Sequence, residues 1–298
     1  MLSNSITPVS IKRIIHNEFS RYDDVVATEE PMEIRVVVAD GTKSKAHSVA
    51  VTMRTPGQDF ELAAGFLLTE GIISQTSDIK EISRDLTEDA ELPLLRMRTP
   101  PIDSDRDNIV NVYLAAGSSF DPMLLTRNFF MTSSCGVCGK DSLEALRVSR
   151  NLPIPKNNST FPPTTIRSLH HSLRKAQDIF QETGGLHAAG FFNSDGNLLT
   201  LMEDVGRHNA MDKLIGHHLL RENIPIEDGL IVVSGRASWE IMQKALAAGI
   251  STVVAMGAPS SLAIELALEF GLTLIGFAGR EDFNIYAGSE RISHRQTT

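Results

Sequence analysis

The sequence predicts an α/β fold, with a mixed sheet and flanking helices in the second half and a smaller α+β unit in the first. Three features of the second half predict this fold. Short runs rich in Val, Ile and Leu recur there. Helical segments separate the last three of these runs, and small residues follow each of the three. Strands that alternate with helices in this way are typical of a parallel or mixed sheet with helices packed on it.

The first half combines a few strands with one amphipathic helix. Residues 1–30 show no strong period, so we expect a partly ordered lead-in, followed by an N-terminal unit over residues 31–132. Asp40-Gly41 is a strong hairpin signal, and Gly71 is a helix stop. The predicted elements are strands at Met32–Val38 and Ala46–Met53 and a helix at Asp59–Glu70, and short apolar runs follow at Leu92–Met97 and Ile109–Leu114.

The second half, residues 133–298, carries the longer series of elements. The polar, proline-rich stretch Leu152–Pro163 is the best linker candidate. Strands are predicted at Ala188–Phe192, Leu198–Met202, Leu230–Val233, Thr252–Met256 and Leu272–Phe277. Helices are predicted at Thr165–Glu182, Asp204–Arg221, Ser238–Ala248 and Ser260–Phe270.

Charge and composition exclude several classes of protein. The chain has 298 residues and a net charge of −9, which argues against a nucleic-acid binder, because such proteins carry a basic surplus or stripe. The N-terminus lacks the pattern of a signal peptide, and no apolar run is long enough to span a membrane. With only two cysteines, closely spaced, there is no disulfide framework. We therefore expect a cytoplasmic protein.

Both cysteines lie in one C-x-x-C, formed by Cys135 and Cys138. The adjoining glycines let the backbone turn tightly, and Lys140 favours the thiolate over the thiol. C-x-x-C is a spacing of reactive thiols and of metal ligands. A redox pair, half of a metal site and a sulfur-handling thiol all remain open from the spacing alone.

Three predicted strands of the second half end in similar loops. In an open α/β sheet, ligands bind beyond the carboxyl ends of the strands, where small residues let a ligand approach the backbone. Arginines can grip a phosphate in bidentate fashion. We therefore predict a phosphate-containing ligand at these loops, although turn and capping residues would look similar. The candidate residues are Ser234, Gly235, Arg236, Gly257, Ser260 and Arg280.

His187 and His208 are candidate acid/base residues, in the polar segments 183–189 and 203–209. A zinc deaminase would carry H-x-E before P-C-x-x-C. Here Ala189 stands where the glutamate would be, and the C-x-x-C precedes the histidine. We predict no catalytic metal, while a structural zinc on these ligands stays open. The histidines at 170, 171, 217 and 218 are predicted to be exposed helix residues without a role.

Several motifs together resemble one family. The sequence is similar to the formate dehydrogenase accessory sulfurtransferase family, known as FdhD, from about residue 30 to residue 290. The blocks that carry the resemblance are Arg54-Thr55-Pro56-Gly57 with segments 65–67 and 69–71, Ser134–Gly139, Thr183–Ala189, Asp204–Ala210, Ser234–Arg236, Gly257–Ser261 and Asn284–Tyr286.

The resemblance implies a sulfur carrier. Family members accept persulfide sulfur from a cysteine desulfurase and pass it to the bis-molybdopterin guanine dinucleotide molybdenum cofactor that formate dehydrogenase needs. Cys135 matches the persulfide-bearing residue, while Cys138 would relay the sulfur or release it by forming a disulfide. A cytidine-deaminase-like second domain and a homodimer are also implied. The segment that matches the cofactor-binding residues is Phe277, Ala278, Gly279, Arg280, Glu281 and Asp282.

Two alternatives belong to other classes. A cofactor-binding chaperone would protect and deliver the molybdenum cofactor without sulfur chemistry. A thiol–disulfide oxidoreductase would need a thioredoxin-like βαβ context, which the sequence around Cys135 does not show.

Overall fold

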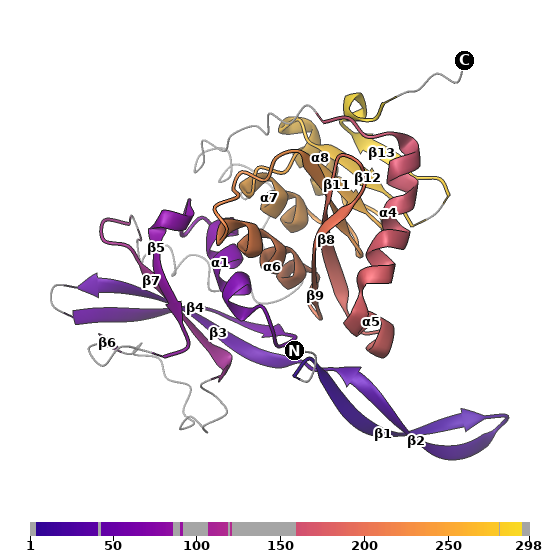
Figure 1. The fold of residues 1–298 in the computed structure, drawn as a ribbon, viewed down its shortest axis with the longest axis horizontal. Coiled ribbons are helices and arrows are strands. Elements are labelled where there is room, and N and C mark those ends of the chain that lie inside the picture. Colours follow the sequence, from indigo (N-terminus) through magenta and orange to yellow (C-terminus); the bar gives the residue numbers. More distant parts are fainter. Residues whose placement is uncertain are drawn as a thin grey trace.

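The computed structural model describes residues 4–40, 43–85, 90–91, 107–118, 120, 159–279 and 281–293. Three sheets form within these ranges: a two-stranded arm, a five-stranded sheet in the N-terminal part and a six-stranded sheet in the C-terminal part (Figure 1). No helix in the described ranges has both the length and the apolar character needed to cross a membrane.

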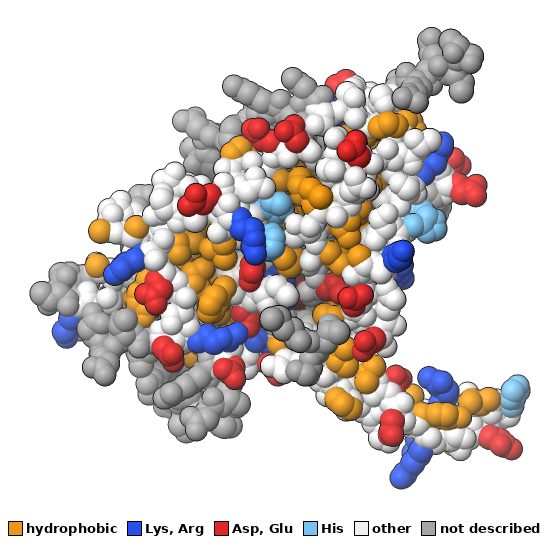
Figure 2. Space-filling model, viewed as in Figure 1, with side chains coloured by type: hydrophobic (Ala, Val, Ile, Leu, Met, Phe, Trp, Pro, Cys, Tyr) orange, Lys and Arg blue, Asp and Glu red, His pale blue; other side chains and the backbone are white. Residues whose placement is uncertain are grey.

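The N-terminal arm replaces the expected lead-in. β1 (Ile6–Ile15) and β2 (Glu18–Ala27) pair along their whole length and project from the body of the molecule (Figure 1). His16 and Asn17 join them with φ of 50° and 69°, the backbone of a tight hairpin turn. The expectation of a partly ordered segment was wrong because β1 carries apolar residues toward both faces, so no alternation marks it as a strand. Hydrophobic side chains lie exposed among charged ones along this arm (Figure 2).

The N-terminal sheet has the strand order β5-β7-β3-β4-β6. The predicted strands at Met32–Val38 and Ala46–Met53 are confirmed, the apolar run Ile109–Leu114 forms a strand, and the short edge strand β5 was not predicted. The apolar run Leu92–Met97 lies outside the described residues. The strands are β3 (Glu30–Asp40), β4 (Lys43–Arg54), β5 (Ile79–Ser83), β6 (Ala90–Glu91) and β7 (Ile109–Leu114).

The C-terminal sheet is mixed, as predicted. Its strand order is β13-β12-β11-β10-β8-β9, in which β10, β11 and β12 run parallel and the other pairings are antiparallel. β13 (Asn284–Ala287) is the one edge strand of this sheet that was not predicted. The other strands are β8 (His187–Asn193), β9 (Leu198–Asp204), β10 (Gly229–Val233), β11 (Thr252–Ala255) and β12 (Thr273–Gly276).

Helices cover both faces of the C-terminal sheet. Successive side chains of β10 point to opposite faces: Leu230 and Val232 join the core under α4 (Pro163–Ala176), whereas Ile231 and Val233 join the core under the other helices. The helices on that second face are α6 (Arg207–Leu219), α7 (Trp239–Ala247) and α8 (Ser261–Glu269). Because β10 is buried on both faces, its sequence is a continuous apolar run.

α1 (Asp59–Thr69) connects the two larger sheets. Its buried residues, including Leu62 and Leu67, share one apolar core with Val112 of the N-terminal sheet and Leu214 of α6. The two sheets are therefore packed around a common core. The boundary predicted at residues 132 and 133 lies outside the described residues and stays a prediction.

The helix predicted at Thr165–Glu182 is in fact two helices, α4 and α5 (Asp178–Thr183), with a break at Gln177. The carboxylate of Glu203, on β9, accepts hydrogen bonds from the backbone N–H groups of Ile179 and Phe180, at 3.2 and 3.0 Å. A carboxylate is stabilised at a helix N-terminus, where N–H groups have no partner within the helix. This contact comes from another element, so helical periodicity alone could not reveal the break.

Candidate functional site

The carboxyl ends of β10, β11 and β12 bring the three predicted loops to one edge of the sheet. Gly257 N–H donates to the carbonyl of Gly235 at 3.0 Å, and Phe277 N–H donates to the carbonyl of Gly257 at 3.1 Å. Backbone hydrogen bonds therefore connect the loops that follow β10, β11 and β12 beyond the ends of these strands. The predicted convergence of the strand ends is confirmed, while the ligand assigned to them stays a prediction.

The loop after β12 lines a hollow of about 500 Å³. Its lining consists of the aromatic ring of Phe277, the carboxyl groups of Glu281 and Asp282 and the amide of Asn284. Phe277 has φ of 58°, a conformation that costs energy for a residue with a Cβ. Carboxylates accept hydrogen bonds and repel anions. The lining thus offers an aromatic residue and acceptor groups to a flat ring with N–H donors, while Nε of Arg167 donates to the carbonyl of Glu281 at 3.0 Å beside it.

The loops that follow β10 and β11 differ in the groups that their side chains present to a ligand. Ser260 caps α8, because its Oγ accepts a hydrogen bond from the N–H of Ala263 at 3.3 Å. Arg236 is exposed. A Cβ on Gly257 would lie 3.1 Å from Cγ of Arg236, so the glycine leaves room for the arginine stem. The guanidinium of Arg236 can therefore bind a ligand, and Ser260, whose oxygen accepts in the helix cap, still has its O–H to donate.

His187 begins β8 and lies beside the loop that follows β10. Its Nδ1 is 3.5 Å from Oγ of Ser234, and that hydroxyl oxygen accepts a hydrogen bond from the N–H of Ala188 at 2.9 Å. Burial lowers the pKa of His187, the positive charge of Arg207 lowers it further, and the negative charge of Asp204 opposes both. His187 is therefore a neutral imidazole at neutral pH.

His208 lies in the first turn of α6 and faces the start of α7. Its Nε2 is 3.5 Å from Oγ of Ser238 and 3.9 Å from a carboxylate oxygen of Glu240. Burial, with the charges of Arg207 and Lys244, lowers the pKa of His208 to about 4. Both candidate histidines are thus neutral, and in that state they can accept a proton but have no imidazolium proton to donate.

The buried carboxylate of Asp204 fixes the backbone that presents His208. It accepts hydrogen bonds from the N–H of Thr55 at 3.1 Å and of Gly206 at 2.8 Å, and from Nδ2 of Asn209 at 3.0 Å. Nζ of the buried Lys213 lies 2.8 Å away. The Thr55 contact crosses from the N-terminal part of the chain to the start of α6, so both parts of the chain shape this edge.

A match to a family model covers almost the whole chain. The model described as the FdhD/NarQ family matches residues 27–293, which include both larger sheets and the strand-end edge. The chain belongs to the FdhD/NarQ family.

Relatives of this FdhD/NarQ chain are similar over nearly their full length. The sulfur carrier protein FdhD of Mycolicibacterium paratuberculosis is 46% identical over 272 residues, covering 90% of this chain and 92% of the relative. The protein of that name from Streptomyces coelicolor is 42% identical, covering 95% and 94%. The protein of that name from Sulfolobus acidocaldarius is 38% identical, covering 96% and 98%.

A solved structure shares the fold of this FdhD/NarQ chain. It is described as a formate dehydrogenase accessory protein from Desulfotalea psychrophila, and it superposes with a TM-score of 0.68 at 23% identity. The match covers 97% of this chain and 99% of that chain. At this identity the likeness concerns the fold alone.

The predicted site residues of the FdhD/NarQ chain divide into placed and unplaced ones. Cys135, Cys138 and Arg280 lie outside the described residues, so their roles stay predictions. Within the described part of the chain, no three His, Cys, Asp or Glu side chains gather as they would around a metal ion. Placed at the strand-end edge are His187, His208, Ser234, Gly235, Arg236, Gly257, Ser260, Phe277, Ala278, Gly279, Glu281 and Asp282.

Two assignments from sequence need correction. His218 was predicted to be exposed, but its side chain is buried and lies edge-on against Phe191. Arg207 was left without a role, although it is the charged neighbour that lowers the pKa of both His187 and His208. The signal that could have found it is its place as the single cation in the polar run 203–209.

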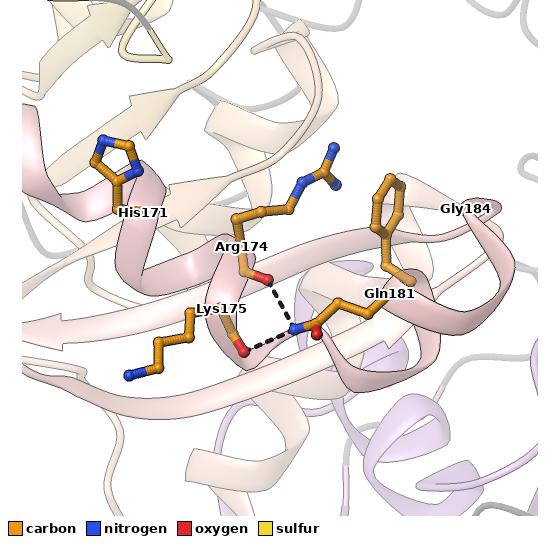
Figure 3. A pocket seen from close by; sticks show the side chains of 6 residues that line it. His171, Arg174, Lys175, Gln181 and Gly184 are labelled. Atoms are coloured by element: carbon orange, nitrogen blue, oxygen red, sulfur yellow. Dashed lines mark hydrogen bonds between the residues drawn. The ribbon is translucent and has the colours of Figure 1, made fainter.

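A second hollow, of about 520 Å³, lies between α4 and α5 (Figure 3). Its side-chain amide, Gln181 Nε2, donates to the carbonyls of Arg174 and Lys175 at 3.3 and 2.8 Å, and the guanidinium of Arg174 lies 3.6 Å from the ring centre of Phe180. None of the predicted site residues lines it. We assign this hollow no role.

Proposed function

We propose that this protein is a sulfur carrier that loads the bis-molybdopterin guanine dinucleotide cofactor needed by formate dehydrogenase. The observation that carries the proposal is the near full-length similarity to proteins named sulfur carrier protein FdhD. The accessory role toward formate dehydrogenase is drawn from the name of the structural relative and from the sequence resemblance.

The sulfur step is assigned to Cys135. Its thiolate attacks the outer sulfur of a persulfide on a cysteine desulfurase, a bond forms to that sulfur, and the desulfurase cysteine leaves as a thiolate. Cys135 then carries the persulfide, and no net oxidation has occurred. If the outer sulfur passes to the cofactor as neutral sulfur, Cys135 returns to its thiolate and the molybdenum of the cofactor supplies the two electrons that reduce the sulfur to sulfide. If the thiolate of Cys138 instead attacks the inner sulfur, a Cys135–Cys138 disulfide forms and the outer sulfur leaves as hydrosulfide. Cys138 relays the sulfur or releases it by disulfide formation.

The cargo is expected to lie along the strand-end edge. A guanine offers a flat ring and N–H donors on its Watson–Crick edge, which match the ring of Phe277 and the acceptors of Glu281, Asp282 and Asn284. Arg236 follows β10, which lies between β12 and β8, and is the cation proposed to meet the phosphates. Arg280, outside the described residues, is proposed to hold the cargo at the Phe277 end. His187 and His208, being neutral, are proposed as proton acceptors beside the cargo. The homodimer and the deaminase-like ancestry of the C-terminal sheet belong to the same proposal.

The test combines sulfur loading with activation. The purified protein is incubated with a cysteine desulfurase and cysteine, and the adduct is located by mass spectrometry of its peptides. We expect one added sulfur atom on Cys135 and none in Cys135→Ser. In a strain lacking the chromosomal copy, Cys135→Ser should fail to activate formate dehydrogenase.

The competing function is a chaperone that binds and delivers the cofactor without sulfur chemistry. A variant with Cys135→Ser and Cys138→Ser separates the two functions. Full formate dehydrogenase activity with this variant would show that delivery, and not sulfur transfer, is what the protein contributes. Loss of activity with intact cofactor binding supports the sulfur carrier.

A further inference from the structure

We propose that Arg207, His187 and His208 form a subsite for a phosphate-type oxyanion, which binds the diphosphate of the cargo. This inference rests on the proposed function for the identity of the cargo. Arg207 and His187 border the same point of the loop after β10, and His208 follows Arg207 in the first turn of α6.

The first observation is that Arg207 has no hydrogen-bond or ion-pair partner among the described residues. Its Nε is buried and makes no hydrogen bond, and none of the residues described in the structure forms an ion pair with its guanidinium. The nearby carboxylate of Asp204 is already committed to Lys213 and to three N–H donors. The other nearby carboxylate, that of Glu240, is partly exposed and forms no ion pair with Arg207. A partly buried cation that is not ion-paired is costly, and an incoming anion reduces that cost.

The second observation is that Arg207 lies next to His187. A Cβ on Gly235 would lie 3.8 Å from Cδ of Arg207 and 3.5 Å from Nδ1 of His187, so both side chains border the same point of the loop after β10. A guanidinium presents planar donors that match the oxygens of a phosphate, and a neutral imidazole adds one further donor.

The third observation concerns the charge felt at the two imidazoles. After burial, the largest influence on the pKa of His187 and of His208 is the positive charge of Arg207. Lys244 acts in the same direction on His208, while the carboxylates of Asp204 and Glu240 act in the opposite direction and less strongly. Glu240 is partly exposed, and its carboxylate lies 3.9 Å from Nε2 of His208. Of the charges that act on the two imidazoles, the positive charge of Arg207 is therefore the largest at both.

The fourth observation concerns the orientation of the nucleotide part of the cargo along the sheet. The hollow at Phe277 presents the carboxylates of Glu281 and Asp282, which repel phosphates. It lies at β12, and His187 lies at β8, three strands away along the edge. Three strand spacings amount to about 14 Å, an extent that suits an extended nucleoside diphosphate. The base therefore lies at Phe277, and the diphosphate points toward Arg207.

The test compares three probes on the full-length protein: inorganic pyrophosphate, GDP and guanosine. Calorimetry is performed on the wild type, on Arg207→Gln and on the control Arg221→Gln, which changes an exposed arginine just beyond the end of α6. Arg207→Gln should weaken pyrophosphate and GDP by about 10- to 100-fold, the effect of losing a charge-assisted hydrogen bond. Guanosine should bind equally to all three proteins.

A second variant and a second readout keep the test decisive. Arg207→Lys keeps the charge and should retain part of the pyrophosphate affinity, even if Arg207→Gln folds poorly. In the wild type, NMR titration should show pyrophosphate raising the pKa of both His187 and His208, because a bound anion stabilises the imidazolium.

The proposal is overturned if Arg207→Gln binds pyrophosphate as the wild type does, if the wild type binds none, or if neither histidine responds. The proposal is also overturned if pyrophosphate changes the pKa of exposed histidines only, and not that of His187 or His208. These results leave the sulfur carrier standing, because sulfur loading of Cys135 is measured separately. Failure of that loading would overturn the proposed function and not the anion subsite.

Discussion

Gly65 of α1 and Gly216 of α6 lie against each other where the two helices cross. A Cβ on Gly65 would overlap the backbone carbonyl of Asp212, and one on Gly216 would overlap that of Glu61. The helices therefore approach as closely as their backbones allow. This contact joins the N-terminal part of the chain to the helix that begins with Arg207 and His208.

Gly216→Ala should destabilise the protein by about 1–3 kcal/mol, because the extra methyl forces the two backbones apart. Alanine would otherwise favour a helix by about 1 kcal/mol over glycine, so a loss of stability reports the overlap itself. Urea unfolding measures the change. The control is Gly185→Ala, whose Cβ would meet Ala27 at an ordinary 3.6 Å. Equal stability of the two variants would contradict the prediction.

Lys213→Met should cost about 3–5 kcal/mol of unfolding free energy, because it leaves the carboxylate of Asp204 buried without its cation. Nζ of Lys213 also donates to the carbonyl of Thr55 at 2.9 Å. In the double variant with Asp204→Asn, part of the loss should be recovered. A double-mutant cycle measures this coupling, and independent, additive losses would show that the pair does not act as a unit.

The site at the carboxyl ends of β10, β11 and β12 could be predicted because the residues that form it are contiguous with their strands in the sequence. Runs such as Leu230–Val233 and the small residues after them are contiguous in sequence, and parallel strands place their carboxyl ends at one edge. The spacing of apolar residues in Asp59–Glu70 predicted α1 for the same reason. Of that apolar face, Phe60 alone proved exposed.

What could not be predicted depends on distant partners. β5 and β13 are edge strands whose sequences are partly polar, and their structure comes from pairing with β7 and β12. The meeting of His187 with Arg207 follows from the register that places His187 opposite Asp204, since α6 begins just beyond that pair. No spacing in the sequence encodes such a register.

The outer part of the arm should contribute little to the stability of the body. Phe19, near the tip, is 73% exposed, whereas Phe192 in β8 is fully buried. Phe19→Ala should change the unfolding free energy by less than about 0.5 kcal/mol, and Phe192→Ala should lower it by about 3–5 kcal/mol. Both are measured by urea unfolding of dilute protein. A large loss in Phe19→Ala would reveal that the arm is covered in solution.

His218 should make the stability depend on pH. Its side chain is buried against Phe191, and burial, followed by the charges of His217 and Arg221, lowers its pKa from 6.5 to about 4. As the pH falls below about 6.5, the unfolded chain binds this proton before the folded protein does, so stability declines. The decline ends near pH 4, where the folded protein also takes up the proton. The full shift corresponds to about 3 kcal/mol.

His218→Phe keeps a ring beside Phe191 but cannot bind a proton. Urea unfolding between pH 4 and pH 7 should therefore show a shallower decline for this variant than for the wild type. Some decline should remain, because His208 also has a pKa lowered to about 4. The same exchange at His171, which is exposed on α4, controls for the substitution itself. An unchanged slope in His218→Phe would mean that the buried imidazole takes up its proton at the same pH in the folded and unfolded chains.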